Sequence, residues 1–408
     1  MNKTIEPQLQ TLLGLEERRQ QDRIRLIASE NYASQAVRLA CSSVLMNKYS
    51  EGYPGKRFYE GQQVVDQVEK LAIARAKALF GADHANVQPY SGSPANLAVY
   101  HAFLRPGETV LGLDLDHGGH LTHGSKASVT GKWFNAVHYK LDPLTGRLDM
   151  GSVAAMARLH RPKLLVCGHS AWPRIPDFAA FRSIADEVGA ILWVDMAHFA
   201  GLVAGGVHPN PVVLADVVTT TTHKTLRGPR GGMILCKEKF GSQLDRALFP
   251  GLQGGPHMHS IAGIAQALWE ASQPEFSQYA RNVVTNAEAL AEGLRLHGFG
   301  LVTGGTQNHL VLVDLRNFSV DGKTFAEALD LAGLVVNANK VPWDDGSASR
   351  PSGIRLGTAA VTTRGFGVAE MVQIADWIKD SVDNLDRPAK LEEIRAQTTA
   401  LARKFPVP

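Results

Sequence analysis

Short apolar runs alternate with amphipathic stretches over much of the chain, and this rhythm limits the folds that the sequence can adopt. The runs that read as buried strands are 108–115, 163–168, 190–196, 216–222 and 231–237. The segment that ends at Gly189 has the apolar spacing and terminal glycine of a helix. Apolar strands joined through helices predict a largely parallel sheet covered by helices. In such sheets, functional residues gather at the carboxyl ends of the strands.

The rest of the chain predicts further helices and a second, smaller sheet. Residues 64–80 carry apolar positions at helical spacing, and residues 91–103 open with the Ser and Gly of a helix start. After Pro256 the pattern changes, and the expected elements are long helices over 257–298, strands within 300–305, 309–315 and 333–337, and helices over 323–331 and 366–384. We predict an N-terminal arm or helix over 1–25, a large domain over 26–275 and a small C-terminal domain over 276–408.

Charge and cysteine content argue against several classes of protein. Lys and Arg total 42 against 39 Asp and Glu, and a net charge of +3 does not suit a dedicated nucleic-acid or membrane-surface binder. No apolar run approaches the ~18 residues of a membrane span, and the N-terminus lacks the apolar stretch of a signal peptide. Cys41, Cys167 and Cys236 lie far apart, which argues against a disulfide framework or a zinc ribbon. We expect a cytoplasmic protein.

Lys224 follows an expected strand, four threonines and His223, and it precedes a Gly- and Arg-rich loop. A buried ammonium is costly unless it has a chemical role, and imine formation removes that cost. A depressed pKa of the amine also makes a lysine nucleophilic. A solvated loop lysine is the ordinary alternative for an isolated Lys.

Asp195 ends another apolar run, within WVDMAHFAG, and is expected at the carboxyl end of its strand. A carboxylate in that place can pair with the protonated nitrogen of a pyridine ring and keep the ring an electron sink. A lone Asp more often caps the following loop or helix. If the strands of Asp195 and Lys224 are neighbours in the sheet, both side chains lie over one cavity.

Two further segments suit the ligands of such a cavity. The sequence YSGSPAN places Ser91, Gly92 and Ser93 at a helix start, where N–H groups and hydroxyls can bind a phosphate. Such loops also occur without a ligand. Arg355, within SGIRLGT, lies in an apolar context, and a guanidinium there is best matched by a bidentate carboxylate. An amino-acid substrate supplies one, and a structural salt bridge is the alternative.

Motifs along nearly the whole chain, in the same order, resemble those of the serine hydroxymethyltransferase family. They are LIASENY (26–32), NKYSEGYPGKR (47–57), HGGHLTHG (117–124), VDMAH (194–198), TTTTHKTLRGPRGG (219–232), FPGLQGGP (249–256) and SGIRLGT (352–358). The resemblance implies an α/β fold of the aspartate-aminotransferase-like pyridoxal-phosphate enzymes (fold type I). Such a fold has a large domain with a mixed, mostly parallel seven-stranded sheet and a smaller α/β C-terminal domain. It also implies a homo-oligomer, a dimer or a dimer of dimers, whose active sites are shared between subunits.

The resemblance also implies a role for each matching residue. The cofactor contacts are expected to be Lys224, which binds pyridoxal 5'-phosphate covalently, Thr221 and His223 beside it, Asp195 at the pyridine nitrogen, His198 at the ring oxygen, His120 stacked on the ring, and Ser170. The phosphate contacts are expected to be Ser91, Gly92 and Ser93, with Gly254 and Gly255 from the partner subunit. Arg230 matches an arginine that orients the site.

Substrate contacts follow in the same way. Arg355 is expected to clamp the substrate carboxylate with help from Ser29 and Tyr59, while Glu51 moves a proton at the substrate hydroxyl and Tyr49 assists from across the interface. The remaining substrate contacts are expected to be Leu115, Gly119, Leu121 and Asn339, the last at the pteridine of folate. Lys224, Glu51, Asp195, His223, Tyr49 and Arg355 are the expected catalytic residues. The implied reaction interconverts serine and glycine, with tetrahydrofolate as co-substrate and one-carbon acceptor.

Some positions depart from the family pattern towards the second substrate. They are Phe58, Glu60, Trp172, Ala338 and Ala359. These departures allow an enzyme with a different substrate specificity. The alternatives are an α-methylserine hydroxymethyltransferase, or a folate-independent threonine aldolase or transaldolase of the same fold. A cofactor-binding protein without catalysis is a third alternative.

Two other kinds of site are weaker alternatives. His117, His120 and His123 are spaced three apart, but their loop carries no adjacent acidic or thiol ligand, so we expect no metal. The basic stretch 226–230 lacks the interleaved aromatics of a nucleic-acid site.

Overall fold

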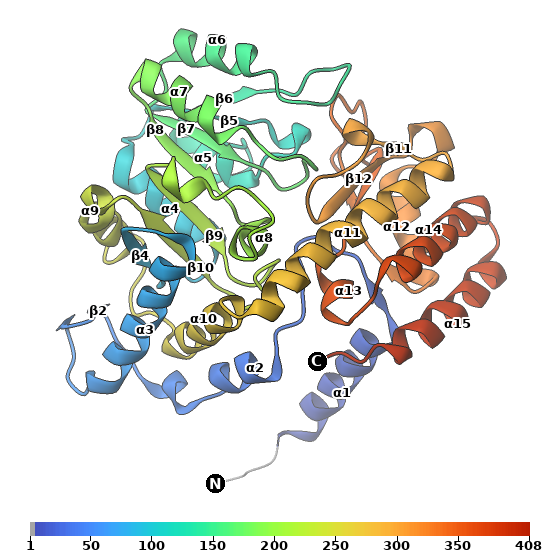
Figure 1. Cartoon of the computed structure of the whole chain (residues 1–408), viewed down its shortest axis with the longest axis horizontal. Helices are drawn as coiled ribbons and strands as arrows, with labels where there is room; N and C mark the ends of the chain where they lie inside the picture. Colours follow the sequence, from blue (N-terminus) through green and yellow to red (C-terminus); the bar gives the residue numbers. More distant parts are fainter. Residues whose placement is uncertain (1–4) are drawn as a thin grey trace.

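The computed structural model describes residues 5–408, and residues 1–4 of the predicted N-terminal arm lie outside the described residues. Seven strands form the central sheet in the order β4–β10–β9–β8–β7–β5–β6 (Figure 1). Their bounds are β4 His84–Asn86, β5 Thr109–Leu113, β6 Asn135–Tyr139, β7 Leu164–Gly168, β8 Ile191–Asp195, β9 Val217–Thr221 and β10 Gly232–Cys236. All the strands predicted for this sheet are present. The short β4 and the more polar β6 were not anticipated.

The sheet is mixed and mostly parallel, as predicted. β6, β5, β7, β8 and β9 run parallel to one another. β10 is antiparallel to both of its neighbours, β9 and β4. A parallel neighbour needs a crossover connection of a dozen or more residues, whereas the short loop between β9 and β10 contains no helix. The chain therefore turns back after Lys224, and the loop stays at the end of the sheet where β8 and β9 finish.

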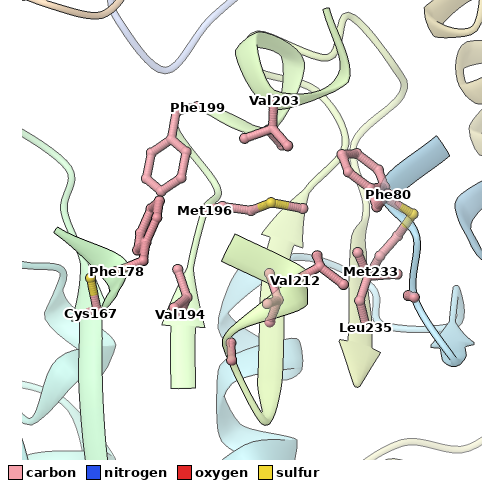
Figure 2. Packing of buried hydrophobic residues seen from close by; sticks show 14 of the residues in the cluster. Phe80, Cys167, Phe178, Val194, Met196, Phe199, Val203, Val212, Met233 and Leu235 are labelled. Carbon is pink, nitrogen blue, oxygen red and sulfur yellow. The ribbon is translucent and has the colours of Figure 1, made fainter. Parts of the chain in front are cut away.

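Helices cover both faces of this sheet (Figure 1). Their bounds are α3 Gln63–Phe80, α4 Gly92–Phe103, α5 Val129–Trp133, α6 Met150–His160, α7 Phe178–Val188, α8 Ala200–Ala204, α9 Glu238–Leu248 and α10 Met258–Ala271. Alternate strand residues face opposite layers: Leu165 of β7 belongs to the core that includes residues of α3, α6, α7 and α10, whereas Val166 belongs to the core that includes residues of α4 and α9. Figure 2 shows part of the first layer, where Phe178 and Phe199 lie next to each other above Cys167.

A smaller antiparallel sheet has the order β11–β12–β15–β14, with β11 Gly300–Leu301, β12 Leu310–Asp314, β14 Asn337–Asn339 and β15 Gly353–Gly357. The helices near it are α11 Pro274–Leu296, α12 Gly322–Leu331, α13 Ala359–Thr363, α14 Val368–Asp383 and α15 Pro388–Lys404. The strand expected within 333–337 is only partly in this sheet. β13 (Leu334–Val335) instead pairs in parallel with β1 (Ile24–Arg25). Burial of Ile24 in the small core explains this choice.

The long helix α11 joins the two cores. Its N-terminal residues, including Phe276, pack into the core of the large sheet, and Leu290 and Leu294 pack into the core of the small sheet. The predicted boundary at 275/276 falls within the first turn of this helix. The domain bounds stay a prediction.

The N-terminal arm contains a helix, α1 (Pro7–Asp22), that precedes β1. The leucines noted along this segment do not enter a core, because Leu9, Leu12, Leu13 and Leu15 are all about half exposed. Two short segments follow: α2 (Gln35–Cys41) and a hairpin of β2 (Gly52–Tyr53) with β3 (Lys56–Arg57). None of the helices within residues 5–408 combines the length and the apolar character needed to cross a membrane.

Candidate active site

A cavity of about 200 Å³ opens where β7, β8 and β9 end. Most of the predicted cofactor contacts line it: Ser91, Gly92, Ser93, His120, Ser170, Asp195, His198, Thr221, His223 and Lys224, together with Ser29 and Arg230. The cavity combines residues from segments far apart in sequence, because parallel strands bring their carboxyl ends to one edge of the sheet. Asp195 ends β8, Lys224 follows β9, and the two strands are direct neighbours.

Lys224 is buried, with 8% of its surface exposed. Burial lowers the pKa of Lys224 to about 8, although Asp195 acts in the opposite direction. No salt bridge within residues 5–408 includes this ammonium, and its main chain is held by Asn31, whose Nδ2 donates to the Lys224 carbonyl at 2.9 Å. The amine is therefore less basic than an ordinary lysine and better suited to act as a nucleophile.

Asp195 is held by two buried side chains. Nε2 of His123 lies 2.9 Å from Oδ2 of Asp195, and Nδ2 of Asn96 donates to the same oxygen at 2.8 Å. Burial alone raises the pKa of Asp195, but the hydrogen bonds with His123 and Asn96 and the other polar groups nearby together outweigh burial and hold that pKa well below its usual value. The carboxylate thus stays ionised in a dry environment and can stabilise a cation beside it.

The start of α4 provides an anion site at the cavity. Ser91 is the N-cap, but its side chain does not cap the helix, so it stays available to a ligand. The first N–H groups of a helix lack intrahelical partners and point at such a ligand. Gly92 has no room for a side chain, because a Cβ there lies 2.7 Å from Cγ2 of Thr221. Glycine thus lets the helix start lie close to the end of β9.

Several histidines in and around the cavity are neutral. Burial is the main cause that lowers the pKa of His120 to about 4 and that of His223 to about 3. Burial also holds the pKa of His198 well below its usual value. Nε2 of His223 lies 3.0 Å from Nη1 of Arg230, and Nδ1 of His198 lies 3.3 Å from Nε2 of His309. Neutral rings can stack on, or hydrogen-bond to, a flat ligand without adding charge.

Arg355, on β15 of the small sheet, does not itself line the cavity but contacts Ser170, which does. Its Nη1 donates to the Ser170 carbonyl at 2.6 Å, and its Nε donates to Oδ1 of Asn337 at 3.1 Å. None of the salt bridges within residues 5–408 includes Arg355, so the structural salt bridge considered from the sequence is absent from this region. Burial lowers the pKa of Arg355 to about 10, which leaves it a cation at neutral pH. Such a guanidinium suits the carboxylate of a ligand.

The polar groups that line the cavity fit a flat, anionic cofactor that carries an aldehyde. Buried polar atoms on the cavity wall lack partners within residues 5–408, namely Asn96 Oδ1, both ring nitrogens of His169, and His223 Nδ1. Buried polar groups are normally hydrogen-bonded, so these atoms favour a polar ligand. The lysine, the ionised aspartate and the helix start match an aldehyde, a ring nitrogen and a phosphate respectively.

Tyr49, Glu51, Tyr59, Gly254 and Gly255 form a separate cluster and do not line this cavity. The Tyr49 hydroxyl donates to Oε1 of Glu51 at 3.1 Å, and the Tyr59 hydroxyl donates to Oε2 at 3.3 Å. A Cβ on Gly254 lies 3.2 Å from Oε1 of Glu51. Tyr59, which we expect to help Arg355 at the substrate carboxylate, lies in this Glu51 cluster, and its role there stays a prediction.

The other expected substrate contacts lie on short turns near the small sheet. Leu115 and Leu121 are partly exposed on 3-10 turns, Leu115–His117 and Leu121–His123. Gly119 lies between these turns, and a Cβ there falls 2.1 Å from the Leu113 carbonyl. Lys340, next to Asn339, pairs with Asp116 at 2.9 Å and ties the end of β14 to the first turn.

The sequence interpretation missed three residues of this region. His123 and Asn96 hold Asp195, and His169 lines the cavity. The first two stand within the motifs quoted above, but nothing local indicated their long-range partner. The statement that the histidine loop has no acidic neighbour was wrong, because ligand atoms of His120, His123 and Asp195 lie within 4.8 Å of one another. The hydrogen bond from His123 to Asp195 accounts for this grouping.

Comparison with known proteins identifies the family. A profile of the family described as serine hydroxymethyltransferase matches residues 3–378. The chain is 60% identical over 403 residues to a serine hydroxymethyltransferase of Desulfotalea psychrophila, which covers 99% of this chain and 95% of that protein. The chain belongs to the serine hydroxymethyltransferase family. Serine hydroxymethyltransferases of Sorangium cellulosum and Acidothermus cellulolyticus are each 57% identical, over 404 and 409 residues, with 99% of this chain and 96% of each relative covered.

Membership confirms the predicted fold type I architecture and the predicted activity. The chain is a transferase that interconverts serine and glycine with tetrahydrofolate, and serine hydroxymethyltransferases use pyridoxal phosphate and tetrahydrofolate. The alternative of an α-methylserine enzyme or a threonine aldolase or transaldolase is not favoured by relatives of this similarity.

Three of the five residues that depart from the family pattern have well-defined surroundings in the structure. Trp172 donates from Nε1 to the Gly146 carbonyl at 3.0 Å, and Ala359 is buried at the start of α13. Phe58 is 72% exposed and lies against Phe249.

Proposed function

We propose that serine and glycine are interconverted in the cavity at the ends of β7, β8 and β9, with Lys224 as the residue that binds pyridoxal phosphate. The observation that carries this proposal is the pair formed by a buried lysine and an ionised aspartate at the ends of neighbouring parallel strands. A cytoplasmic location stays a prediction.

The residues that line the cavity support the cofactor contacts that we propose. Asp195 would hold the ring nitrogen, Ser91 to Ser93 the phosphate, and neutral His198 and His120 the ring oxygen and ring face. Thr221, His223 and Ser170 would complete the contacts. When bound, pyridoxal phosphate supplies an electron sink for the bond that breaks at the amino acid.

Arg355 would bind the carboxylate of serine or glycine and so set which bond faces the electron sink. Its hydrogen bonds to the Ser170 carbonyl and Asn337 hold the guanidinium between the two sheets. Glu51 would accept the proton that the serine hydroxyl loses, and the hydroxyls of Tyr49 and Tyr59 would orient its two oxygens. The Leu115 and Leu121 turns, Gly119 and Asn339 would bind the folate.

Replacement of Arg355 by Lys tests the carboxylate contact. We expect KM for serine to rise and kcat/KM to fall by about 10- to 100-fold, because an ammonium cannot form the bidentate pair. Initial rates with varied serine measure both constants. Arg316→Lys changes an exposed arginine beside the same small sheet and serves as the control. An unchanged KM for serine in Arg355→Lys contradicts the role.

The Glu51 cluster lies outside the cavity of its own chain, which supports an active site completed by a second copy. Apolar side chains are also exposed on several N-terminal segments that a second copy can cover: Leu9, Leu12 and Leu13 on α1, Leu39 on α2, and Val44 and Met46 just after it. We propose a homo-oligomer in which the Glu51 cluster of one subunit meets the Lys224 cavity of the other.

Mixed oligomers test this arrangement. We expect Lys224→Ala and Glu51→Gln chains to be nearly inactive alone, while purified one-to-one heterodimers recover about half of wild-type activity, because one of two symmetric sites is intact. Differently tagged chains allow the heterodimer to be isolated before assay. In the matched control, Lys224→Ala is paired with Asp195→Asn. Both changes lie in the cavity, so each of the two sites of this heterodimer carries a change and activity should not recover. Heterodimers of the first pair that form but stay inactive disprove a shared site.

A further inference from the structure

Glu51 stands at the entrance of a very small hairpin. It directly precedes β2, which pairs with β3 through Gly52 and Arg57 and through Tyr53 and Lys56. Gly52 has a φ of +92°, and a Cβ there lies 2.3 Å from the Lys56 carbonyl. Two-residue strands are not stable by themselves, so the place of Glu51 depends on contacts from outside the hairpin.

Arg57 supplies contacts on both sides of Glu51. Its Nη1 donates to the Ser50 carbonyl at 2.8 Å and to the Gly52 carbonyl at 2.7 Å. These carbonyls flank Glu51 in the chain. The Arg57 side chain is only 3% exposed, so water does not compete for these bonds.

Arg57 is in turn held by α3. Oε2 of Glu69 accepts from Nη2 of Arg57 at 2.6 Å, and Oδ1 of Asp66 accepts from Nε at 2.9 Å. Glu69 also accepts from Nε2 of Gln88 at 2.7 Å, and Gln88 donates to the Gly52 carbonyl at 3.0 Å. The Glu69 side chain is 1% exposed, so its charge depends on these partners. We name Arg57, Asp66, Glu69 and Gln88 the α3 clamp.

We propose that Glu69, through Arg57, is a positioning residue for Glu51 in hydroxymethyl transfer. The inference rests on the proposed role of Glu51 and explains how Glu51 is kept in position. The buried carboxylate of Glu69, on the 18-residue helix α3, orients the Arg57 guanidinium, which in turn donates hydrogen bonds to the backbone on both sides of Glu51. No member of the α3 clamp lines the cavity, so its effect reaches the chemistry through Glu51.

The first test is Glu69→Gln, which keeps the shape of the side chain but removes the charge that orients Arg57. We expect kcat for folate-dependent serine cleavage to fall by about 10- to 100-fold, the scale of a misplaced catalytic group. KM for serine should stay within about twofold, because Arg355 is untouched. Exchange of the glycine α-proton involves no hydroxyl and should be unchanged. Equal loss in both reactions overturns the proposal.

A double-mutant cycle separates positioning from general damage. If Glu69 acts through Glu51, Glu51→Gln/Glu69→Gln loses no more kcat than Glu51→Gln alone. Additive losses of kcat contradict the positioning role of Glu69 and leave the proposed role of Glu51 unaffected. An unchanged kcat in Glu51→Gln overturns both. Asp216→Asn weakens another partly buried pair, with Arg182, away from the hairpin, and should leave the ratio of the two reactions unchanged.

Arg57→Lys covers the case in which Glu69→Gln does not fold. A lysine keeps a cation beside Glu69 and Asp66, but it lacks the planar fork that reaches two carbonyls and two carboxylates. Hydrogen–deuterium exchange of the folded variant should be faster in residues 48–58 than in the wild type, with α4 unchanged. Exchange in 48–58 equal to that of the wild type overturns the proposal.

Discussion

Lys224→Ala is expected to abolish serine turnover, with kcat lowered by more than about 10³-fold. The loss follows because this lysine is the only amine among the residues that line the cavity. The absorbance near ~420 nm, typical of the imine-linked cofactor, should disappear as well. Spectra of the purified protein with added pyridoxal phosphate, together with steady-state rates, measure both effects.

The fold of Lys224→Ala should be intact, because the change removes a buried ammonium that has no salt-bridge partner within residues 5–408. The melting temperature of the cofactor-free protein checks this point. Lys237→Ala, at the end of the neighbouring strand β10, should keep both absorbance and turnover. A borohydride-reducible link between protein and cofactor that persists in Lys224→Ala would falsify the assignment.

Asp195→Asn should lower kcat by about 10²- to 10³-fold, the usual effect of removing one preorganised electrostatic group. The neutral amide fills the same space and can still meet His123 and Asn96, but it cannot stabilise a protonated ring nitrogen. KM for serine should change little, because the carboxylate contact is made by Arg355. Rates at saturating serine and folate, with cofactor content measured by absorbance, show the effect.

The control for this change is Asp177→Asn. Asp177 caps α7, and an asparagine caps nearly as well, so the same loss of charge on the same domain should leave kcat unchanged. If Asp195→Asn retains both its cofactor and near-wild-type kcat, Asp195 does not support the electron sink.

Much of the large sheet could be predicted because its information is local. Buried parallel strands are continuous apolar runs, and such runs identified β5, β7, β8, β9 and β10. Polar residues at or just after the ends of two of these runs then indicated the site, which is why Asp195 and Lys224 were found. β4 and β6 carry weaker patterns, since His84, Asn86, Asn135 and His138 interrupt them.

The partners of the site residues could not be predicted in this way. Asp195 is held by Asn96 and His123, and Arg57 is held by Glu69 and Asp66. Each contact joins residues of separate elements, and its existence depends on how those elements pack. The position of Glu51 outside the cavity of its own chain has the same origin.

The sequence by itself determined that Asp195 and Lys224 lie at the carboxyl ends of two strands of the large sheet, because strand period and strand ends are local properties. Only the tertiary structure decided that β10 is antiparallel to β9, that β13 pairs with β1, and that Glu51 and Lys224 belong to different clusters. These choices depend on burial and hydrogen bonding between distant segments. The free energy that stabilises each of these arrangements comes from contacts between elements that meet only in the folded chain.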